Sequence, residues 1–266
     1  MTNNIFWYDG KFIHSQTLEL NINDPGLLYG ATVFTTLRVY QNSLDHNLTN
    51  WQAHCDRLLF SVKTFGWQQP DWKRLRQGAQ ILLAHFPVLR ITLFPDGREW
   101  IIGRFLPTDL TERQKNGIEC ATVSSEFSRS LPSHKTGNYL SAWLAKTKTS
   151  LDAQEAILVD AQGNWLETST GNLWGWCDRS WYTPPKNAGI LPGIMRSQLV
   201  NWLQNHQQSI QEEPWSVELV QRFEAIAYTN SVVEIIPIHT VYLPSGSLQC
   251  NPYHHSFQLI RELFLA

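Results

Sequence analysis

The chain has 266 residues, of which 42% are hydrophobic, and its formal net charge is -2. A near-neutral chain of this length can bury a large core, as two domains or one large one, and has no basic excess that would favour nucleic acid or an anionic membrane. The cysteines form no CxxC pair, so neither a zinc site nor a disulfide framework is indicated, and we expect a reduced, cytoplasmic setting. No run approaches the roughly 20 apolar residues that span a bilayer, and the N-terminus does not resemble a secretion signal.

The first part of the chain is predicted to combine short strands with two helices. Asp9-Gly10 suits a two-residue hairpin turn, because glycine accepts a positive φ. Asn50 can cap the first helix, whose apolar residues repeat at helical spacing. The predicted elements are strands at 5–8, 11–13 and 27–40, helices at 50–65 and 71–85, and strands at 88–94 and 100–105.

The composition changes near residue 107, where a polar stretch without apolar periodicity begins. We therefore expect an α+β domain at 1–110, a linker at 111–117 and a second domain at 118–266. No GxGxxG sequence follows a strand, so a Rossmann domain finds no support. The second domain is predicted to contain strands at 118–124, 155–160, 165–169, 172–177, 181–183 and 225–229, and helices after Lys135 and up to His206.

A lysine precedes two apolar runs of this second domain, and a glutamate lies near the end of the second run. Lys135 follows a loop, and Glu167 ends the second of two strands that turn at Gly163. Taken singly, most lysines are solvated and most strand glutamates lie at the surface. In this order, however, the two residues have the chemistry that a pyridoxal phosphate enzyme needs. The lysine forms a Schiff base with the cofactor aldehyde, and the carboxylate keeps the pyridine nitrogen protonated, so that the ring can accept electrons.

The stretch from Ser133 to Asn172 resembles the class IV (fold type IV) pyridoxal phosphate enzymes, and the resemblance extends over nearly the whole chain. This family includes branched-chain aminotransferases, D-amino acid aminotransferases and 4-amino-4-deoxychorismate lyases. The resemblance implies pyridoxal 5′-phosphate as cofactor, no metal, a small-molecule substrate and a homodimer. It also implies a two-domain α+β fold of the D-amino acid aminotransferase type, with a smaller α/β N-terminal domain and a larger mixed-sheet C-terminal domain.

The resemblance also implies which residues hold the cofactor. Arg57, in His54-x-x-Arg57, would bind the phosphate, because a guanidinium offers a planar fork of charged donors. The glycine at 193 precedes a helix whose first amides suit a phosphate, although such an entry is by itself commonly plain capping. The expected cofactor residues are Arg57, Lys135, Glu167, Thr170, Ile194, Met195, Ser231 and Val232, with Lys135 as the catalytic residue.

Four residues are implied on the substrate side. A Tyr-Gly loop before a Val-Phe-x-x-x-Arg strand lines this side in the family, and it matches Tyr29, Thr36 and Arg38. Arg98 lies just beyond a predicted turn, where related lyases and D-amino acid aminotransferases carry an arginine. The sequence does not rank these candidates as ligands of a substrate carboxylate.

The subtype rests on spacing around the lysine and on the strand before Arg38. Branched-chain aminotransferases usually have four residues between the lysine and the tyrosine, whereas Lys135 and Tyr139 are separated by three, as in the lyases and D-amino acid aminotransferases. Phe34-Thr-Thr-Leu-Arg38 also resembles the lyases, while Glu234 resembles the aminotransferases. The favoured interpretation is a 4-amino-4-deoxychorismate lyase of folate biosynthesis, which gives 4-aminobenzoate and pyruvate. A class IV aminotransferase acting on branched-chain or D-amino acids is the alternative, and a non-catalytic aromatic-rich binding protein is a third hypothesis.

Overall fold

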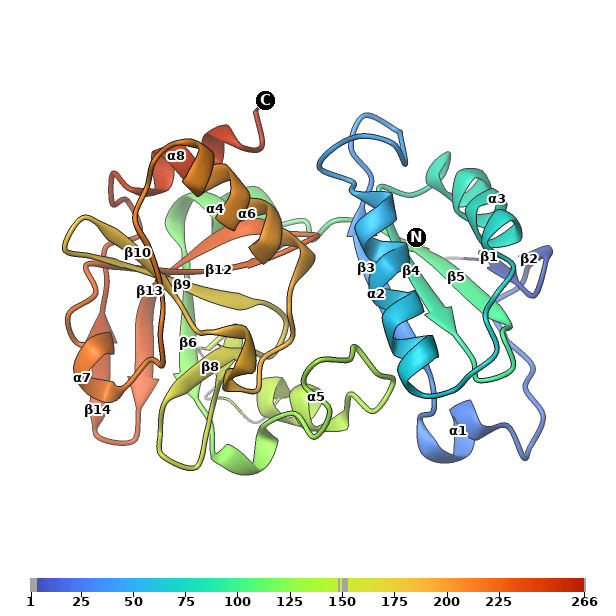
Figure 1. Ribbon diagram of the computed structural model, residues 1–266, viewed down its shortest axis with the longest axis horizontal. Helices are drawn as coiled ribbons and strands as arrows, with labels where there is room; N and C mark the ends of the chain where they lie inside the picture. Colours follow the sequence, from blue (N-terminus) through green and yellow to red (C-terminus); the bar gives the residue numbers. More distant parts are fainter. Residues whose placement is uncertain (1–3, 148, 150–152, 266) are drawn as a thin grey trace. The chain divides into compact units, whose positions relative to one another are not determined.

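A computed structural model describes residues 4–147, 149 and 153–265 (Figure 1). The chain divides into two compact units. Unit 1 comprises Met1–Pro107 and His134–Asn138, and unit 2 comprises Thr108–Ser133 and Tyr139–Ala266. The division falls near residue 107, where the composition changes, but five residues around Lys135 belong with the first unit rather than the second.

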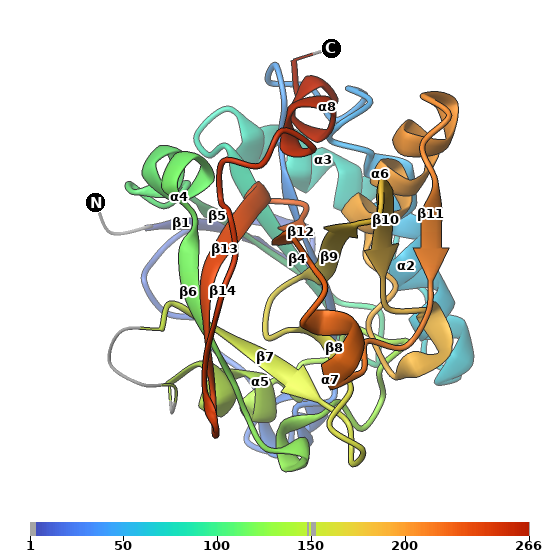
Figure 2. The same cartoon turned by 90° about the vertical axis from the view of Figure 1, so that its left-hand side faces the viewer.

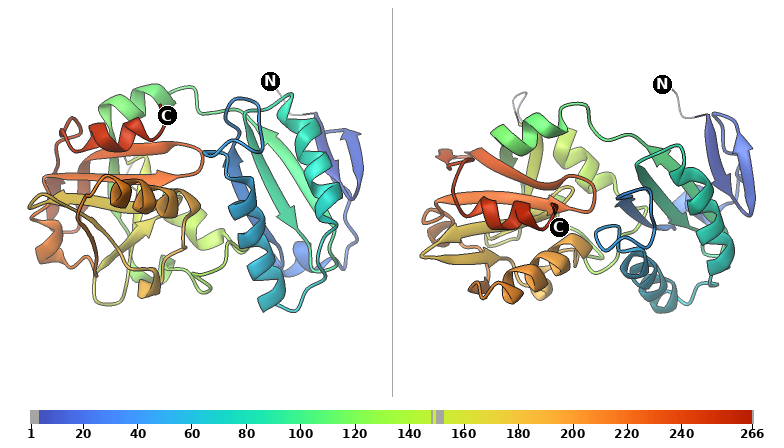
Figure 3. Two further views of the ribbon diagram at one scale, coloured as in Figure 1. Left: turned by 45° about the horizontal axis from the view of Figure 1, so that its top comes forward. Right: turned by 90° about the horizontal axis from the view of Figure 1, so that it is seen from above.

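Unit 1 is built on an antiparallel sheet of five strands in the order β2-β1-β5-β4-β3. Helices α2 and α3 pack on one face of this sheet (Figures 1 and 3). The predicted hairpin is present, since Tyr8 pairs with Lys11 and both turn residues have positive φ. The elements are β1 (Ile5–Tyr8), β2 (Lys11–His14), α1 (Pro25–Tyr29), β3 (Val33–Arg38), α2 (Trp51–Thr64), α3 (Trp72–Leu83), β4 (Val88–Leu93) and β5 (Glu99–Arg104).

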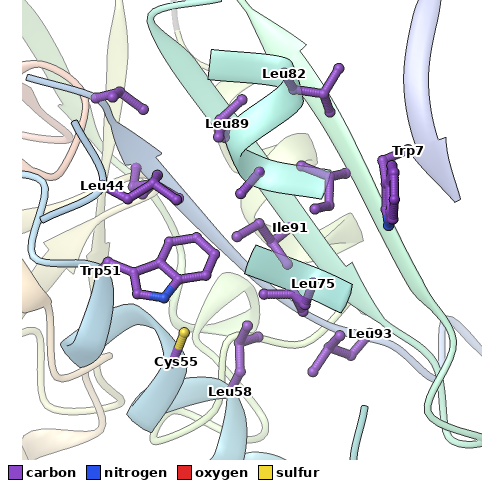
Figure 4. Packing of buried hydrophobic residues seen from close by; sticks show 14 of the residues in the cluster. Trp7, Leu44, Trp51, Cys55, Leu58, Leu75, Leu82, Leu89, Ile91 and Leu93 are labelled. Carbon is purple, nitrogen blue, oxygen red and sulfur yellow. The ribbon is translucent and has the colours of Figure 1, made fainter. Parts of the chain in front are cut away.

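The core of unit 1 lies between the two helices and the sheet (Figure 4). Leu58 from α2 and Leu75 from α3 face Leu89 and Ile91 from β4, and all four are essentially inaccessible to solvent. Each such side chain contributes about 1.5 to 3 kcal/mol when fully buried. This packing holds β3 and α2 together, and these two elements carry several of the expected site residues.

Two details of unit 1 differ from the sequence prediction. The predicted strand at 27–40 begins only at Val33, because Asp24 caps a short helix with Pro25 at its first position, where proline is favoured. Asn50 precedes α2 as expected, but it has a left-handed backbone conformation and its side chain makes no capping hydrogen bond. The helix itself is present within a residue of both predicted ends.

Unit 2 contains a mixed sheet of nine strands in which β6 pairs in parallel with both β7 and β13 (Figure 2). An additional pairing between β8 and β9 joins the ends of the path β9-β12-β13-β6-β7-β8 and closes these strands into a ring. The strands are β6 (Ile118–Thr122), β7 (Glu155–Val159), β8 (Trp165–Thr168), β9 (Asn172–Cys177), β10 (Ser180–Thr183), β11 (Ile210–Glu212), β12 (Ala225–Asn230), β13 (Glu234–Leu243) and β14 (Gly246–Gln249).

The helices of unit 2 cover its sheet from several sides, with α6 and α8 in mutual contact (Figure 3). Trp174 and Trp181 are fully buried in a core that also includes residues of α6 and α8, so these tryptophans serve packing. The helices are α4 (Leu110–Asn116), α5 (Leu140–Thr147), α6 (Ile194–Asn205), α7 (Val217–Val220) and α8 (Phe257–Glu262), with short 3-10 turns at Ser125–Phe127 and Lys186–Ala188.

Helix α4 occupies the stretch that was predicted to be a linker. It is held mostly by polar contacts, which leave no apolar periodicity in the sequence. Arg113 pairs with Asp109 at 2.7 Å, and the Gln114 amide donates to the Val233 carbonyl at 3.0 Å, while Leu110 alone in the helix is buried. Among the described residues, no helix is long and apolar enough to cross a membrane.

Candidate active site

Lys135 is held against the edge strand of the sheet in unit 1. The Phe34 amide donates to the Lys135 carbonyl at 2.8 Å, and Val33 forms an antiparallel bridge with Thr136. The Lys135 Nζ lies 4.8 Å from the centre of the Phe34 ring. The backbone and the side chain of the predicted catalytic lysine therefore both contact β3.

Arg57 lies on α2 and donates from Nη2 to the Thr35 hydroxyl. The same hydroxyl lies 2.6 Å from Nδ1 of His54, one turn earlier on α2. Burial, and then the charges of Arg57 and Lys135, hold the pKa of His54 well below its usual value, so the imidazole is neutral. The network is satisfied when Thr35 accepts from Arg57 and donates to an unprotonated Nδ1. Thr35 and His54 thus orient the expected phosphate ligand.

Thr36 and Arg38 lie on the other face of β3 from Thr35, because side chains alternate along a strand. They share that face with Phe34. Thr36 is paired across the sheet with Arg90, whose guanidinium carbon lies 3.6 Å from the centre of the Phe34 ring. The sequence analysis missed Arg90, although the alternation in two paired strands could have placed it opposite Thr36 once their register was known. Unit 1 therefore brings two cationic groups, from Lys135 and Arg90, to one phenylalanine ring.

The other two expected substrate residues are placed differently. Arg98 is paired with Asp24 and Asp96, each at 2.6 Å, and also donates to the hydroxyl of Tyr8. Burial alone would raise the pKa of Asp24, but the hydrogen bond and charge of Arg98, together with the backbone amides of Gly26 and Leu27, lower it below its usual value. Tyr29, at the end of α1, is 76% exposed. A substrate carboxylate at Arg98 would therefore compete with two carboxylates of the chain itself.

Glu167, at the other end of the predicted pair, is a buried carboxylate on β8 of unit 2. Three donors converge on it. Arg129 donates from Nε at 2.5 Å, the Leu191 amide at 3.3 Å and the Asn172 side chain at 3.4 Å. Burial works against the charge of Arg129, yet the Glu167 carboxylate raises the pKa of this arginine. Arg129 was not singled out from the sequence, and its loop position gave no periodic signal.

The turn after Glu167 is fixed by a second buried glutamate. Glu155, at the start of β7, accepts hydrogen bonds from the Thr170 hydroxyl at 2.6 Å and from the Ser169 hydroxyl. Tyr139 donates to the Ser169 carbonyl at 2.5 Å. The hydroxyl of Thr170 is thus engaged within unit 2, and its role toward a cofactor stays a prediction.

Helix α6 begins at Ile194, one residue after Gly193, close to the same carboxylate. The side chain of Asn172 donates to the Leu191 carbonyl at 2.8 Å as well as to Glu167, so the approach to this helix is tied to β8 and β9. The first amides of a helix have no partner within it, which suits an anion at Ile194 and Met195. In the loop after β12, Val232 donates its amide to the Asn230 side chain at 2.9 Å, next to Ser231.

The donors within each unit are of the kinds that pyridoxal phosphate needs. The amine of Lys135 and the guanidinium of Arg57 lie in unit 1, and the buried carboxylate of Glu167 and the start of α6 lie in unit 2. The described residues include no group of three or more histidine, cysteine, aspartate or glutamate side chains that could hold a metal ion.

Comparison with known proteins gives the family. The family model of class IV aminotransferases matches residues 32–241. The chain belongs to this family. Its expected two-domain α+β fold is confirmed, and so is pyridoxal 5′-phosphate as the cofactor of the class IV aminotransferases to which it belongs.

Individual relatives of this class IV protein are distant. An aminodeoxychorismate lyase from Vibrio harveyi is 22% identical over 262 residues, covering 92% of the chain and 94% of the relative. A branched-chain-amino-acid aminotransferase from Escherichia coli strain K12 is 23% identical over 276 residues, covering 92% and 88%. The solved PLP-bound form of a hypothetical aminotransferase from Mycobacterium tuberculosis matches with a TM-score of 0.79 and 20% identity, over 97% of this chain and 98% of that one. These identities leave lyase and aminotransferase both open.

Proposed function

We propose that the chain is a pyridoxal phosphate-dependent 4-amino-4-deoxychorismate lyase, which forms 4-aminobenzoate and pyruvate. In this proposal Lys135 is the catalytic residue, Arg57 is the phosphate ligand and Glu167 is the partner of the pyridine nitrogen. The observation that carries the proposal is the cluster on β3, where the amine of Lys135 and the guanidinium of Arg90 flank Phe34 on the face that also bears Thr36 and Arg38.

This cluster suits an acidic substrate. 4-Amino-4-deoxychorismate carries two carboxylates, and each guanidinium can bind a carboxylate through two parallel hydrogen bonds. Arg38 and Arg90 stand on neighbouring strands, with Thr36 between them as a neutral donor and acceptor. The charge of the cluster therefore suits a substrate that carries two carboxylates.

The chemistry assigned to the residues follows from their groups. Bound pyridoxal phosphate supplies a ring that accepts an electron pair. Lys135 removes the proton from the carbon that bears the substrate amino group, acting as general base. The bond to the enolpyruvyl oxygen then breaks as the substrate ring becomes aromatic, and the released enolpyruvate takes up a proton to become pyruvate. Glu167, oriented by Arg129, holds a proton at the pyridine nitrogen, and Arg57 holds the phosphate.

An aminotransferase is the second candidate, and the branched-chain relative supports it. Both reactions begin with the same proton removal, but a transaminase stops after half a cycle unless a second substrate is added. The decisive experiment supplies 4-amino-4-deoxychorismate alone and measures 4-aminobenzoate by fluorescence and pyruvate enzymatically. Equal amounts over many turnovers are expected. Rapid transamination of branched-chain or D-amino acids with 2-oxoglutarate, and no 4-aminobenzoate, would instead establish the aminotransferase.

The remaining expectations belong to the same proposal. We propose a homodimer in the cytoplasm, with a role in folate biosynthesis. Ile22, Leu27 and Leu28 form an exposed apolar stretch at α1, which supports association with a second copy. Sedimentation of the purified protein tests the oligomeric state.

A further inference from the structure

The segment that carries Lys135 is a short piece of chain docked on unit 1, although the residues before and after it belong to unit 2. On its C-terminal side the docking is done by the backbone. Gly137 donates its amide to the Thr32 carbonyl at 2.7 Å, and a Cβ at Gly137 would lie 2.1 Å from the Thr32 hydroxyl and 2.8 Å from the Gly30 carbonyl oxygen. Because the Gly30 carbonyl is part of the backbone, the close approach of the two segments favours glycine at position 137.

On the N-terminal side the docking depends on one side chain, that of His134. Its ring stacks on Phe60 with centres 5.0 Å apart and planes inclined by 8°, and it also contacts Phe65 at 4.6 Å. Its Nδ1 lies 2.9 Å from the hydroxyl of Ser61. All three partners lie on α2 or at its end, and His134 is 92% buried, that is, 8% exposed.

The Ser61 hydroxyl connects this histidine to the phosphate side of the unit. It lies 3.3 Å from the carbonyl of Arg57, one turn earlier on α2, so one hydroxyl links the turn that carries Arg57 to the residue before Lys135. A small displacement of His134 would therefore move Lys135 relative to Arg57 on α2.

We propose that His134 is a positioning residue that fixes Lys135 relative to α2 and Arg57 by locking its imidazole between Phe60, Phe65 and Ser61. The proposal rests on the proposed function, because it assumes that Lys135 reacts with the cofactor. Burial lowers the pKa of His134, so the docked imidazole is neutral and adds no positive charge next to the lysine.

The first test needs no cofactor and measures hydrogen exchange of the Gly137 amide in the cofactor-free protein. His134→Ala removes the ring contacts and the hydrogen bond, and should raise the exchange rate about 10- to 100-fold. His134→Phe keeps a ring but loses the hydrogen bond, as does Ser61→Ala, and each should raise the rate by only about fivefold. The matched control is His85→Ala, which removes another unit 1 histidine that contacts two phenylalanine rings, and should leave Gly137 exchange unchanged.

The second test uses the loaded enzyme. In His134→Ala, displacement of Lys135 should shift the pH midpoint of the bound cofactor's visible absorbance. It should also lower kcat about 10- to 100-fold with little change in KM, because the misplaced amine acts in the chemical step. His134→Phe should have an absorbance midpoint and a kcat close to those of the wild type. Should His134→Ala not fold, the same comparison is made with His134→Phe and Ser61→Ala, for which smaller changes of the same sign are expected.

Two results overturn the inference. Unchanged Gly137 exchange in the variants means that His134 does not hold the segment. Raised exchange with an unchanged absorbance midpoint and kcat means that it is only structural. Borohydride reduction of the wild-type holoenzyme separates this failure from failure of the proposed function, because labelling of a lysine other than Lys135 removes the catalytic assignment whatever the exchange rates show.

Discussion

The two units contribute opposite charges and hold them in different ways. In unit 1, Arg57 is oriented by the neutral groups of Thr35 and His54, and Lys135 lies over an aromatic ring. In unit 2, the buried Glu167 is paired with Arg129. Hydrogen bonds from neutral groups thus orient Arg57 in unit 1, whereas an ion pair with an arginine holds the carboxylate in unit 2. We therefore expect substitutions in unit 1 to change attachment of the cofactor and those in unit 2 to change the rate of reaction.

A second comparison shows that a buried carboxylate paired with an arginine does not by itself identify a functional group. Glu99 in unit 1 is as buried as Glu167 and also accepts from three donors, Arg74 at 2.6 Å and Trp7 and Gly10 at 2.9 Å. Glu99 ties the first hairpin to α3. Glu167 instead stands where β8 closes on β9, beside the approach to α6. The surroundings of the pair, rather than its geometry, distinguish the two, and Glu99 serves as a matched control.

The largest expected effect is that of Lys135→Ala. Removal of the amine abolishes both covalent attachment and proton transfer, so turnover should disappear and borohydride should no longer fix the cofactor to the peptide 134–138. Absorbance of the purified protein and mass analysis of the reduced protein measure the two losses. Lys63→Ala, on the exposed side of α2, should behave like the wild type. Persistent labelling in Lys135→Ala would contradict the assignment.

Glu167→Gln should keep bound cofactor but lower kcat about 100- to 1,000-fold, because a neutral amide cannot hold the proton on the pyridine nitrogen. Steady-state kinetics and the visible spectrum of the loaded variant provide the measurements. Glu99→Gln should lower the unfolding free energy by about 1 to 3 kcal/mol and leave kcat nearly unchanged, because it weakens a buried network away from the reaction. Equal effects of both variants on kcat would remove the distinction between the two glutamates.

The elements that the sequence predicts correctly are those with strong local signals. The hairpin at Asp9-Gly10 and the helix that bears Arg57 follow from turn chemistry and periodicity, and both are present. The residues that it missed are those defined by long-range contacts. Arg129 lies in a loop and meets Glu167 across 38 residues, and Arg90 meets Phe34 only through the register of β3 and β4.

The same reasoning explains the errors in the elements. Residues 27–40 have a strand composition, but a cap from Asp24 and a proline turn the first of them into α1. Helix α4 lacks an apolar stripe because it is held through Arg113 and Gln114, so its sequence looks like a linker. In both places polar contacts outweighed the average propensity of the stretch, a local one at Asp24 and, for α4, one between Gln114 and the distant Val233.

Arg57→Ala should raise the dissociation constant of the cofactor about 10- to 150-fold, since a charge-assisted hydrogen bond of about 1.5 to 3 kcal/mol is lost. Equilibrium dialysis of the cofactor measures the change, which should exceed that of Glu167→Gln if unit 1 governs attachment. Arg76→Ala, on α3 and paired with Asp45, is the control in the same unit. An affinity equal to that of the wild type would exclude Arg57 as a phosphate ligand.

The smallest expected effect concerns His54 and acid stability. The pKa of this buried histidine is held below its usual value, so the unfolded chain takes up a proton more readily than the folded one. Its contribution to stability is therefore complete above about pH 6.5 and is lost as the pH falls toward the folded pKa, by at most about 1.4 kcal/mol for each pH unit. His54→Gln keeps an amide near Thr35 but cannot titrate. Urea unfolding at pH 7.5 and 5.0 should thus show a smaller loss of stability in this variant than in the wild type, by up to about 2 kcal/mol. His206→Gln, at the exposed end of α6, should lose as much as the wild type. If His54→Gln and the wild type lose the same stability, the neutral imidazole that orients Thr35 and Arg57 is not part of the folded state.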